Sequence, residues 1–389
     1  MPPPLPLFPV TMVGSWPRPW ELLRAQRKKR HGRMAPGDFD GLADLATIDV
    51  LRRQEAAGVD VVTDGELRRD NFFSFVAEKL DGVELYTLAE MLDLVEDKAA
   101  FELILQTLDA PAYAISNAVC VGKIALRRPL AVDDLRFAQL HTARPIKVTL
   151  PGPYLLTRAM YVPKATSASY PTKEDLGADV TRVLRQEIEA LAAEGAAFIQ
   201  LDEPVLTELV FTHGRTRTFM CAALAERGDP SEELELATHL MNEVLDGAAL
   251  GDTRIGLHVC RGNWSRDESI LLRGGYHPLA PWLERMTGVH QFVLEYATER
   301  AGDLIRFDRD RPDREIGLGV VNPRSATVET PVEIASRVAR ALELYPAERI
   351  WINPDCGFGT FSNRPVNGVE IATRKLEAMV AAARYLRGA

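Results

Sequence analysis

The sequence predicts a single (β/α)8 barrel, a closed ring of eight parallel strands surrounded by helices, over residues 1–389. Three observations lead to this prediction. Eight short apolar segments each end abruptly in a polar or glycine-containing turn, amphipathic helical patterns lie between many of them, and polar clusters follow the apolar segments. Strand, turn and helix repeated about eight times is typical of a barrel whose active site forms at the carboxyl ends of the strands.

The candidate strands are rich in β-branched residues and nearly continuous in hydrophobicity. Strands buried on both faces of a parallel sheet have this composition. In chain order the candidate strands occupy residues 10–13, 59–62, 146–150, 198–201, 255–257, 292–294, 316–321 and 350–352.

Apolar residues at three-four spacing predict helices between several of these strands. The clearest patterns cover residues 42–51, 176–191 and 334–344, and Gly58 and Gly195 are expected to stop the first two. Two stretches depart from the alternation. We expect a hairpin-like or helical insertion between strands 2 and 3, at about residues 80–145, and a smaller excursion at residues 207–235.

Composition excludes several classes of protein. A net charge of −9 argues against a nucleic-acid binder, which needs a basic face. No apolar run reaches the roughly 20 residues that span a bilayer. The proline-rich start lacks the basic and apolar regions of a secretory signal, so a cytoplasmic protein is expected. Four cysteines in a chain of this length do not suggest a disulfide scaffold.

Four potential metal ligands lie at the ends of three late strands. His258 and Cys260 are two residues apart at one strand end, so a regular strand points both side chains to the same face. Glu295 ends the next strand and Cys356 follows the last. Two thiolates, an imidazole and a carboxylate suit tetrahedral Zn²⁺ and disfavour Mg²⁺ and Ca²⁺. Ordinary packing of a histidine and a cysteine is the alternative.

The charge of such a ligand set indicates what the metal would do. Two thiolates and a carboxylate make Zn²⁺ a weak Lewis acid toward water, and the site is better suited to binding a substrate thiol. Coordination stabilises the thiolate near neutral pH and leaves it able to attack an alkyl carbon. No catalytic residue is assigned beyond the metal site.

Polar groups on the same rim are candidates for holding the substrate. Glu66 and Asp202 also end strands, and two carboxylates facing one pocket suit a substrate ammonium. An acid/base pair or a structural pair are the alternatives. Gly14 and Ser15 offer backbone N–H groups and a hydroxyl that suit a substrate carboxylate, and a simple turn is the alternative.

Taken together, these residues resemble the catalytic barrel of the cobalamin-independent methionine synthase family. The matching segments occur in the family's order and span most of the chain: Val13-Gly14-Ser15, Asp64-Gly65-Glu66, Gln200-Leu201-Asp202-Glu203-Pro204, His258-Val259-Cys260, Glu295 and Asn353-Pro354-Asp355-Cys356-Gly357. The resemblance implies a zinc ion held by His258, Cys260, Glu295 and Cys356. It also implies that Ser15 binds the carboxylate end of homocysteine and that Glu66 and Asp202 bind its ammonium.

The chain departs from the family pattern in three places. It has room for one barrel where two-barrel members have two, Arg158 and its neighbours stand near the position of a folate-region tryptophan, and the segment from Val321 to Ser325 lacks the family's proton-donor histidine. The resemblance therefore implies methylation of homocysteine to methionine, with methyltetrahydrofolate or a methylated corrinoid carrier protein as donor.

Three alternatives to homocysteine methylation remain. The first is a zinc alkyltransferase acting on another thiol, similar to the epoxyalkane:coenzyme M enzymes. The second is a lyase similar to uroporphyrinogen decarboxylase, which needs no zinc. The third is a non-catalytic barrel with a structural zinc.

Overall fold

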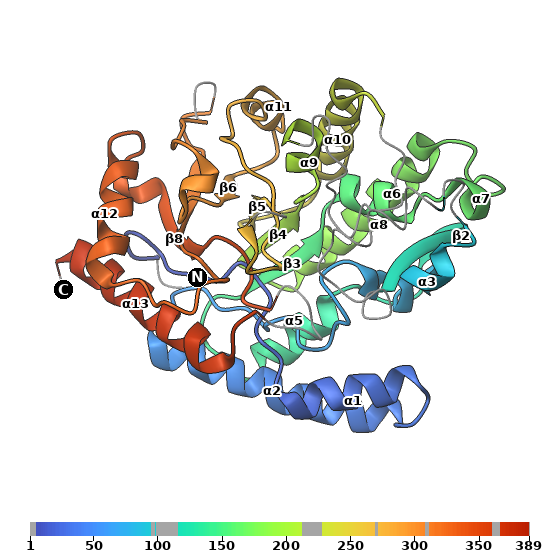
Figure 1. The fold of residues 1–389 in the computed structure, drawn as a ribbon, viewed down its shortest axis with the longest axis horizontal. Coiled ribbons are helices and arrows are strands. Elements are labelled where there is room, and N and C mark those ends of the chain that lie inside the picture. Colours follow the sequence, from blue (N-terminus) through green and yellow to red (C-terminus); the bar gives the residue numbers. More distant parts are fainter. Residues whose placement is uncertain are drawn as a thin grey trace.

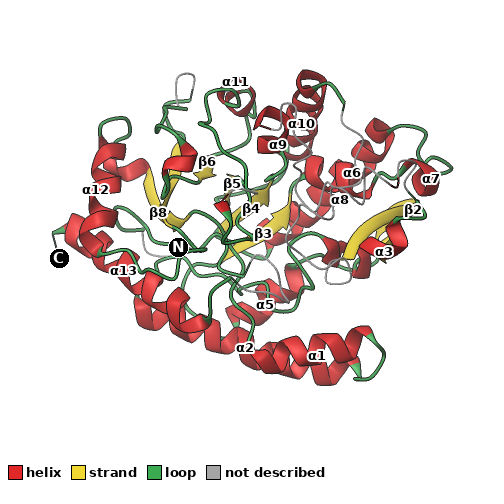
Figure 2. Cartoon of the chain, in the orientation of Figure 1, coloured by secondary structure: helices red, strands yellow, loops and turns green. Residues whose placement is uncertain are grey.

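The computed structural model describes residues 5–94, 98, 116–211, 228–268, 271–307, 311–359 and 366–388. At its centre lies a parallel sheet of six strands, with helices around the outside (Figures 1 and 2). Each strand pairs with the next one in the chain, which is the winding of a barrel. The strands are β3 (Lys147–Pro151), β4 (Phe198–Asp202), β5 (Arg254–Val259), β6 (Gln291–Leu294), β7 (Glu315–Val321) and β8 (Ile350–Pro354).

The first two predicted strands are present as isolated parallel bridges and not as regular strands. The bridges are Val10↔Ile352, Thr11↔Val61 and Val62↔Ile146, so pairing passes from β8 through both segments back to β3. The backbone N–H of Val10 donates to the Asp60 carboxylate at 2.8 Å. Because a side chain takes this place in the hydrogen-bond ladder, the segment is too irregular to form a strand.

The helices cover the sheet as the apolar spacing predicts, and the three clearest predictions are confirmed. Residues 42–51 lie in α2, which ends at Gly58 with a left-handed φ of 91°. Residues 176–191 lie in α8, and the third pattern lies in α12 except for its last two residues, which follow the end of the helix at Leu342. The helices between and after the barrel strands are α1 (Trp20–Arg30), α2 (Pro36–Ala57), α6 (Pro153–Met160), α7 (Pro163–Thr166), α8 (Lys173–Ala193), α9 (Leu206–Phe211), α10 (Pro230–Leu245), α11 (Ala280–Glu284), α12 (Pro331–Leu342) and α13 (Val369–Arg387).

The predicted insertion between the second and third strand positions contains an antiparallel hairpin of β1 (Leu80–Thr87) and β2 (Ser116–Leu126). It lies to one side of the central sheet (Figure 2), and the short helix α3 (Leu88–Met91) packs against β1. The other short helix of this region, α5 (Val132–Gln139), packs against α2 and α8 in the outer helix layer. The predicted excursion at 207–235 begins in α9 and ends in α10, and its residues 212–227 lie outside the described part of the chain. That residues 1–389 form one domain stays a prediction.

A small apolar cluster, separate from the main core, is formed by residues of several barrel segments. It consists of Val13, Val61, Phe198, Val293 and Trp351, and the rings of Phe198 and Trp351 are 5.6 Å apart between centroids. The polar residues that follow the strands lie at the carboxyl ends, where the active sites of such barrels form. Within the described residues, no helix combines the length and apolar character needed to cross a membrane.

Candidate metal centre

The ends of β5 and β8 bring three of the predicted ligands together. His258 lies in β5, Cys260 directly follows it, and Cys356 follows β8. Their ligand atoms all lie within 4.8 Å of one another, and the two sulfur atoms are 3.9 Å apart. All three side chains are buried. Residues 96 positions apart thus converge because parallel strand ends meet on one rim.

The imidazole of His258 is oriented for ligation. Its Nδ1 lies 3.1 Å from the carbonyl oxygen of Val293 on β6. Because a carbonyl only accepts, Nδ1 carries the proton and Nε2 keeps its lone pair. Nε2 is buried and has no hydrogen-bond partner among the described residues. A buried nitrogen without a partner is costly unless something else occupies its lone pair, and a metal ion does so.

The two thiols have the chemistry of soft-metal ligands. The hydrogen bond from Cys356, assisted by the neighbouring imidazole of His258, lowers the pKa of Cys260 well below its ordinary value although burial opposes this. A thiol with a lowered pKa is available as the thiolate, which is the form that binds metal. Two sulfur atoms and one imidazole nitrogen fit Zn²⁺ and not the hard cations that prefer oxygen.

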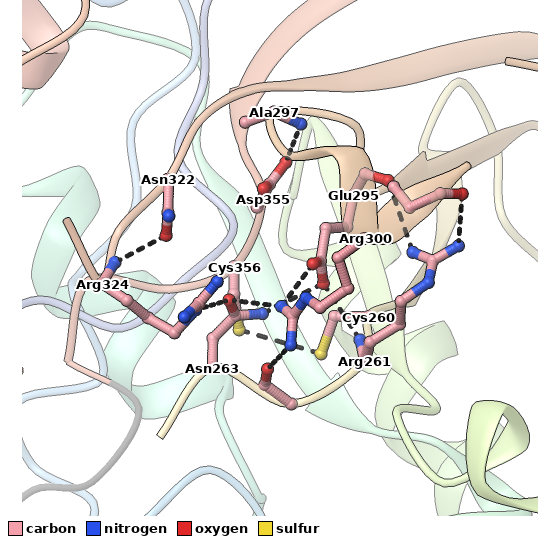
Figure 3. Close-up of polar contacts among 12 residues, drawn as sticks. Cys260, Arg261, Asn263, Glu295, Ala297, Arg300, Asn322, Arg324, Asp355 and Cys356 are labelled. Carbon is pink, nitrogen blue, oxygen red and sulfur yellow. Dashed lines mark hydrogen bonds and ion pairs between the residues drawn. The ribbon is translucent and has the colours of Figure 1, made fainter. Parts of the chain in front are cut away.

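Glu295, the fourth predicted ligand, lies on the same rim but outside this group of three (Figure 3). Its Oε1 pairs with the guanidinium of Arg300, and its Oε2 accepts from the backbone N–H of Arg261 at 3.0 Å and from Asn263 Nδ2 at 3.2 Å. Burial alone would raise the pKa of Glu295, but the charges of Arg300 and Arg261 outweigh it and hold the pKa below its ordinary value. The carboxylate is therefore ionised and fully engaged by protein donors.

Ser15 lies directly beside the loop that carries Cys356. A Cβ added to Gly357 would stand 2.1 Å from the hydroxyl oxygen of Ser15. The carbonyl of Ser15 also accepts from the backbone N–H groups of Phe358 and Gly359, at 2.9 and 3.2 Å. The first strand end and the last are thus held together, and Ser15 lies next to the residue that follows Cys356.

Glu66 is held against the same turn in a strained conformation. Its φ of 57° is in the left-handed region, which side chains with a Cβ seldom adopt. Arg18 donates to its carbonyl oxygen at 2.7 Å, and Thr149 donates to its Oε1 at 2.8 Å. A Cβ on Gly14 would lie 2.3 Å from that Oε1, so the carboxylate rests on the backbone next to Ser15.

Asp202 connects this polar pocket to the histidine. It ends β4 opposite His258 in the strand register, and its Oδ1 accepts from Gln200 Nε2 at 2.7 Å. Burial, reinforced by the charge of Glu66, raises the pKa of Asp202 to about 7. A buried carboxyl with a raised pKa gains most from a positive partner, which a substrate ammonium supplies.

Several residues that shape the site were not singled out from the sequence. Thr149 is a polar residue inside an otherwise apolar strand, and this interruption was a usable signal. Gln200 was quoted only as part of a matching segment and was given no role of its own. Arg300 lies in a short 3-10 helix (Glu299–Ala301) and Arg324 in a turn after β7, and neither segment has a periodicity that indicates which way a side chain points. Only the short separation of Arg300 from Glu295 hinted at its role.

Comparison with known proteins gives a consistent result. Residues 8–385 match the family described as cobalamin-independent synthase, catalytic domain. The chain is 30% identical to a methionine synthase of Thermococcus kodakarensis, over 96% of this chain and 95% of that protein. It is also 30% identical to a methionine synthase of Saccharolobus solfataricus, over 98% and 96%.

Solved structures agree in fold. A B12-independent methionine synthase from Shewanella sp. W3-18-1, in complex with selenomethionine, superposes with a TM-score of 0.72 at 21% identity and 98% coverage of both chains. A putative vitamin-B12 independent methionine synthase from Listeria monocytogenes gives 0.69 at 21% identity, covering 98% of this chain and 99% of that one. At these identities the likeness establishes the fold.

Proposed function

The chain belongs to the cobalamin-independent methionine synthase family and is a methyltransferase of the homocysteine S-methyltransferase type, and from this premise we propose that it methylates homocysteine at a zinc ion held by His258, Cys260 and Cys356. The observation that carries the proposal is the cluster of two sulfur atoms around a histidine nitrogen that has no partner among the described residues. Glu295 remains the proposed fourth ligand.

A zinc ion bound there would stabilise the thiolate of an incoming thiol near neutral pH. The protein's own groups would hold the rest of the substrate. Ser15 would bind the carboxylate through its hydroxyl, while Glu66 and Asp202 would bind the ammonium. Fixing both ends of the amino acid places the thiol toward the cysteines and excludes water from its path, and such positioning is a large part of the catalysis of transfer reactions.

The two carboxylates favour an α-amino thiol over a sulfonate thiol such as coenzyme M. A sulfonate has no ammonium to pair with Glu66 and Asp202 and would be repelled by both. The Shewanella relative was solved with selenomethionine, an amino acid of the product's shape, which supports the same choice. A lyase similar to uroporphyrinogen decarboxylase would leave His258, Cys260 and Cys356 without a role.

Two donors fit the proposal, methyltetrahydrofolate and a methylated corrinoid protein. Asn322 and Arg324 occupy the segment after β7 where the family carries a proton-donor histidine, and this segment has no histidine. Neither an amide nor a guanidinium side chain serves as a general acid in the way that an imidazole does. A donor that needs no protonation as it leaves, such as a methylated corrinoid, is therefore the one to test beside the folate. Cys120, Cys260 and Cys356 form no disulfide in the described part of the chain, which fits a reducing compartment, and we propose the cytoplasm.

The test is a turnover assay of the zinc-loaded protein with homocysteine and each donor in turn, read by methionine formation. Coenzyme M serves as the competing thiol. The expected result is methionine from at least one donor and no methylated coenzyme M. Methylation of coenzyme M in preference to homocysteine would overturn the proposed acceptor.

A further inference from the structure

Glu295 is a buried carboxylate with two competing sets of partners. It lies on the rim with Cys260 and Cys356, yet its Oε1 faces the guanidinium of Arg300 (Figure 3). Its Oε2 is taken by the backbone N–H of Arg261 and by Asn263. The side chain is fully buried, so no water competes for it and its partners are decided within the protein.

Arg300 is itself fixed and cannot readily follow Glu295. It donates to the carbonyl oxygen of Gly262 at 3.0 Å and to Asn263 Oδ1 at 3.1 Å. Its side chain is 1% exposed. An arginine held in this way is a preorganised fork for a carboxylate, because little conformational entropy is lost when the pair forms.

Asn263 extends the network away from the cysteines. Its Oδ1 also accepts from Arg324 Nε at 2.9 Å, and Arg324 forms an ion pair with Glu268 at 2.6 Å. Asn263 thus links Glu295 on one side with Arg324 on the other. The orientation of its amide is set by three partners, since Nδ2 must face the carboxylate and Oδ1 the two guanidinium groups.

We propose that Arg300 is a positioning residue that competes with the bound metal for Glu295. With Glu295 on Arg300, the metal has three protein donors and one open position for a thiol. With Glu295 on the metal, the site has four protein donors and is closed, as in structural zinc sites. The network of Arg300 and Asn263 therefore sets how readily the site opens. This inference rests on the proposed zinc function.

The experiment is a chelator competition that measures Zn²⁺ affinity of the metal-free full chain and of Arg300→Gln, Glu295→Gln and the double variant. Loss of the arginine should free Glu295 to bind the metal, so Arg300→Gln should bind Zn²⁺ about tenfold more tightly, the lower end of the usual effect of residues around a metal site. Glu295→Gln alone should change the Zn²⁺ affinity much less than Arg300→Gln does. The double variant should not bind Zn²⁺ more tightly than the wild type, because it has no carboxylate at position 295 to reach the metal.

Co²⁺ substitution gives a second readout that does not depend on turnover. Homocysteine should produce a strong sulfur-to-cobalt absorption band in the wild type and a weaker one, at equal thiol, in Arg300→Gln. Arg300→Lys keeps the charge and should restore most of the wild-type behaviour. Arg324→Gln is the matched control, because it removes a buried arginine of the same network without contact to Glu295.

Arg300→Gln with wild-type Zn²⁺ affinity and wild-type thiol response would overturn this inference. An equal gain in Arg324→Gln would also overturn it, because the effect would then be a general loosening of the loops. Failure of the proposed function looks different: Zn²⁺ would then bind no more tightly to the wild type than to Cys260→Ser.

Discussion

Glu66 and Asp202 are close enough for their charges to interact, but they depend on different supports. Thr149 and the backbone of Gly14 hold the Glu66 carboxylate, whereas Gln200 holds Asp202 next to His258. Both positions were predicted from the sequence because each follows an apolar strand. Their supports were not, since sequence gives no measure of which polar residues meet across a barrel.

Replacing either carboxylate with its amide should weaken homocysteine binding by about tenfold or more, because a hydrogen bond to a charged group contributes about 1.5–3 kcal/mol. Glu66→Gln and Asp202→Asn keep the size of the side chain, and zinc affinity should change far less. Equilibrium dialysis of homocysteine and of zinc separates the two effects. Unchanged homocysteine affinity in both variants would point to another thiol.

Lys147, on β3 below this pocket, is a buried amine with no hydrogen-bond partner among the described residues. Burial lowers its pKa to about 7, well below its value in an unfolded chain. The folded protein therefore binds fewer protons than the unfolded one between about pH 7 and 10, and this group makes the protein more stable as pH rises through that window.

Lys147→Met should raise the free energy of unfolding by about 1–3 kcal/mol at pH 6, the cost of a buried polar group without a partner. The gain should shrink as pH rises from about 7 toward about 10, the window in which the folded amine is neutral while the unfolded amine still carries its proton. Urea unfolding of both proteins across this range measures the difference. A gain independent of pH would show that the amine does not titrate as described.

At the scale of secondary-structure elements, the turns that follow the strands set the positions of the proposed substrate-binding side chains. Gly14→Ala would place a Cβ 2.3 Å from Glu66 Oε1 and 2.9 Å from a methyl group of Thr149. We expect this variant to displace the carboxylate and weaken homocysteine binding by about tenfold. Gly41→Ala, on α2, is the matched control because its added Cβ meets nothing within 4 Å. Equal affinity of the two variants for homocysteine would contradict the account of this turn.

Apolar runs and helical spacing were sufficient to predict β3 to β8 and the helices α2, α8 and α12. The segments at 10–13 and 59–62 have the same composition, yet they form only isolated bridges. The Asp60 carboxylate accepts the hydrogen bond that the backbone N–H of Val10 would donate to a neighbouring strand. The pattern of apolar residues along the sequence does not reveal a tertiary contact of this kind. Glu295 illustrates the same limit, since its place after β6 was predictable but its pairing with Arg300 was not.

At the scale of the whole molecule, the residues that stabilise the fold are distinct from the residues of the proposed metal site. The large apolar core lies between the sheet and the helices, whereas the cysteines stand at the strand ends. The double variant Cys260→Ser, Cys356→Ser should therefore have a Tm, measured without metal, within a few degrees of the wild-type value. Substitutions that leave the apolar core intact usually have effects of this size. Circular dichroism on heating measures this, and loss of the cooperative transition would show that the rim supports the fold.

The most direct measurement is the zinc content of the purified protein and of this double cysteine variant, by elemental analysis against protein concentration. The account predicts about one zinc per chain in the wild type and almost none in the variant. Stoichiometric zinc in a folded variant lacking both sulfur atoms would contradict it.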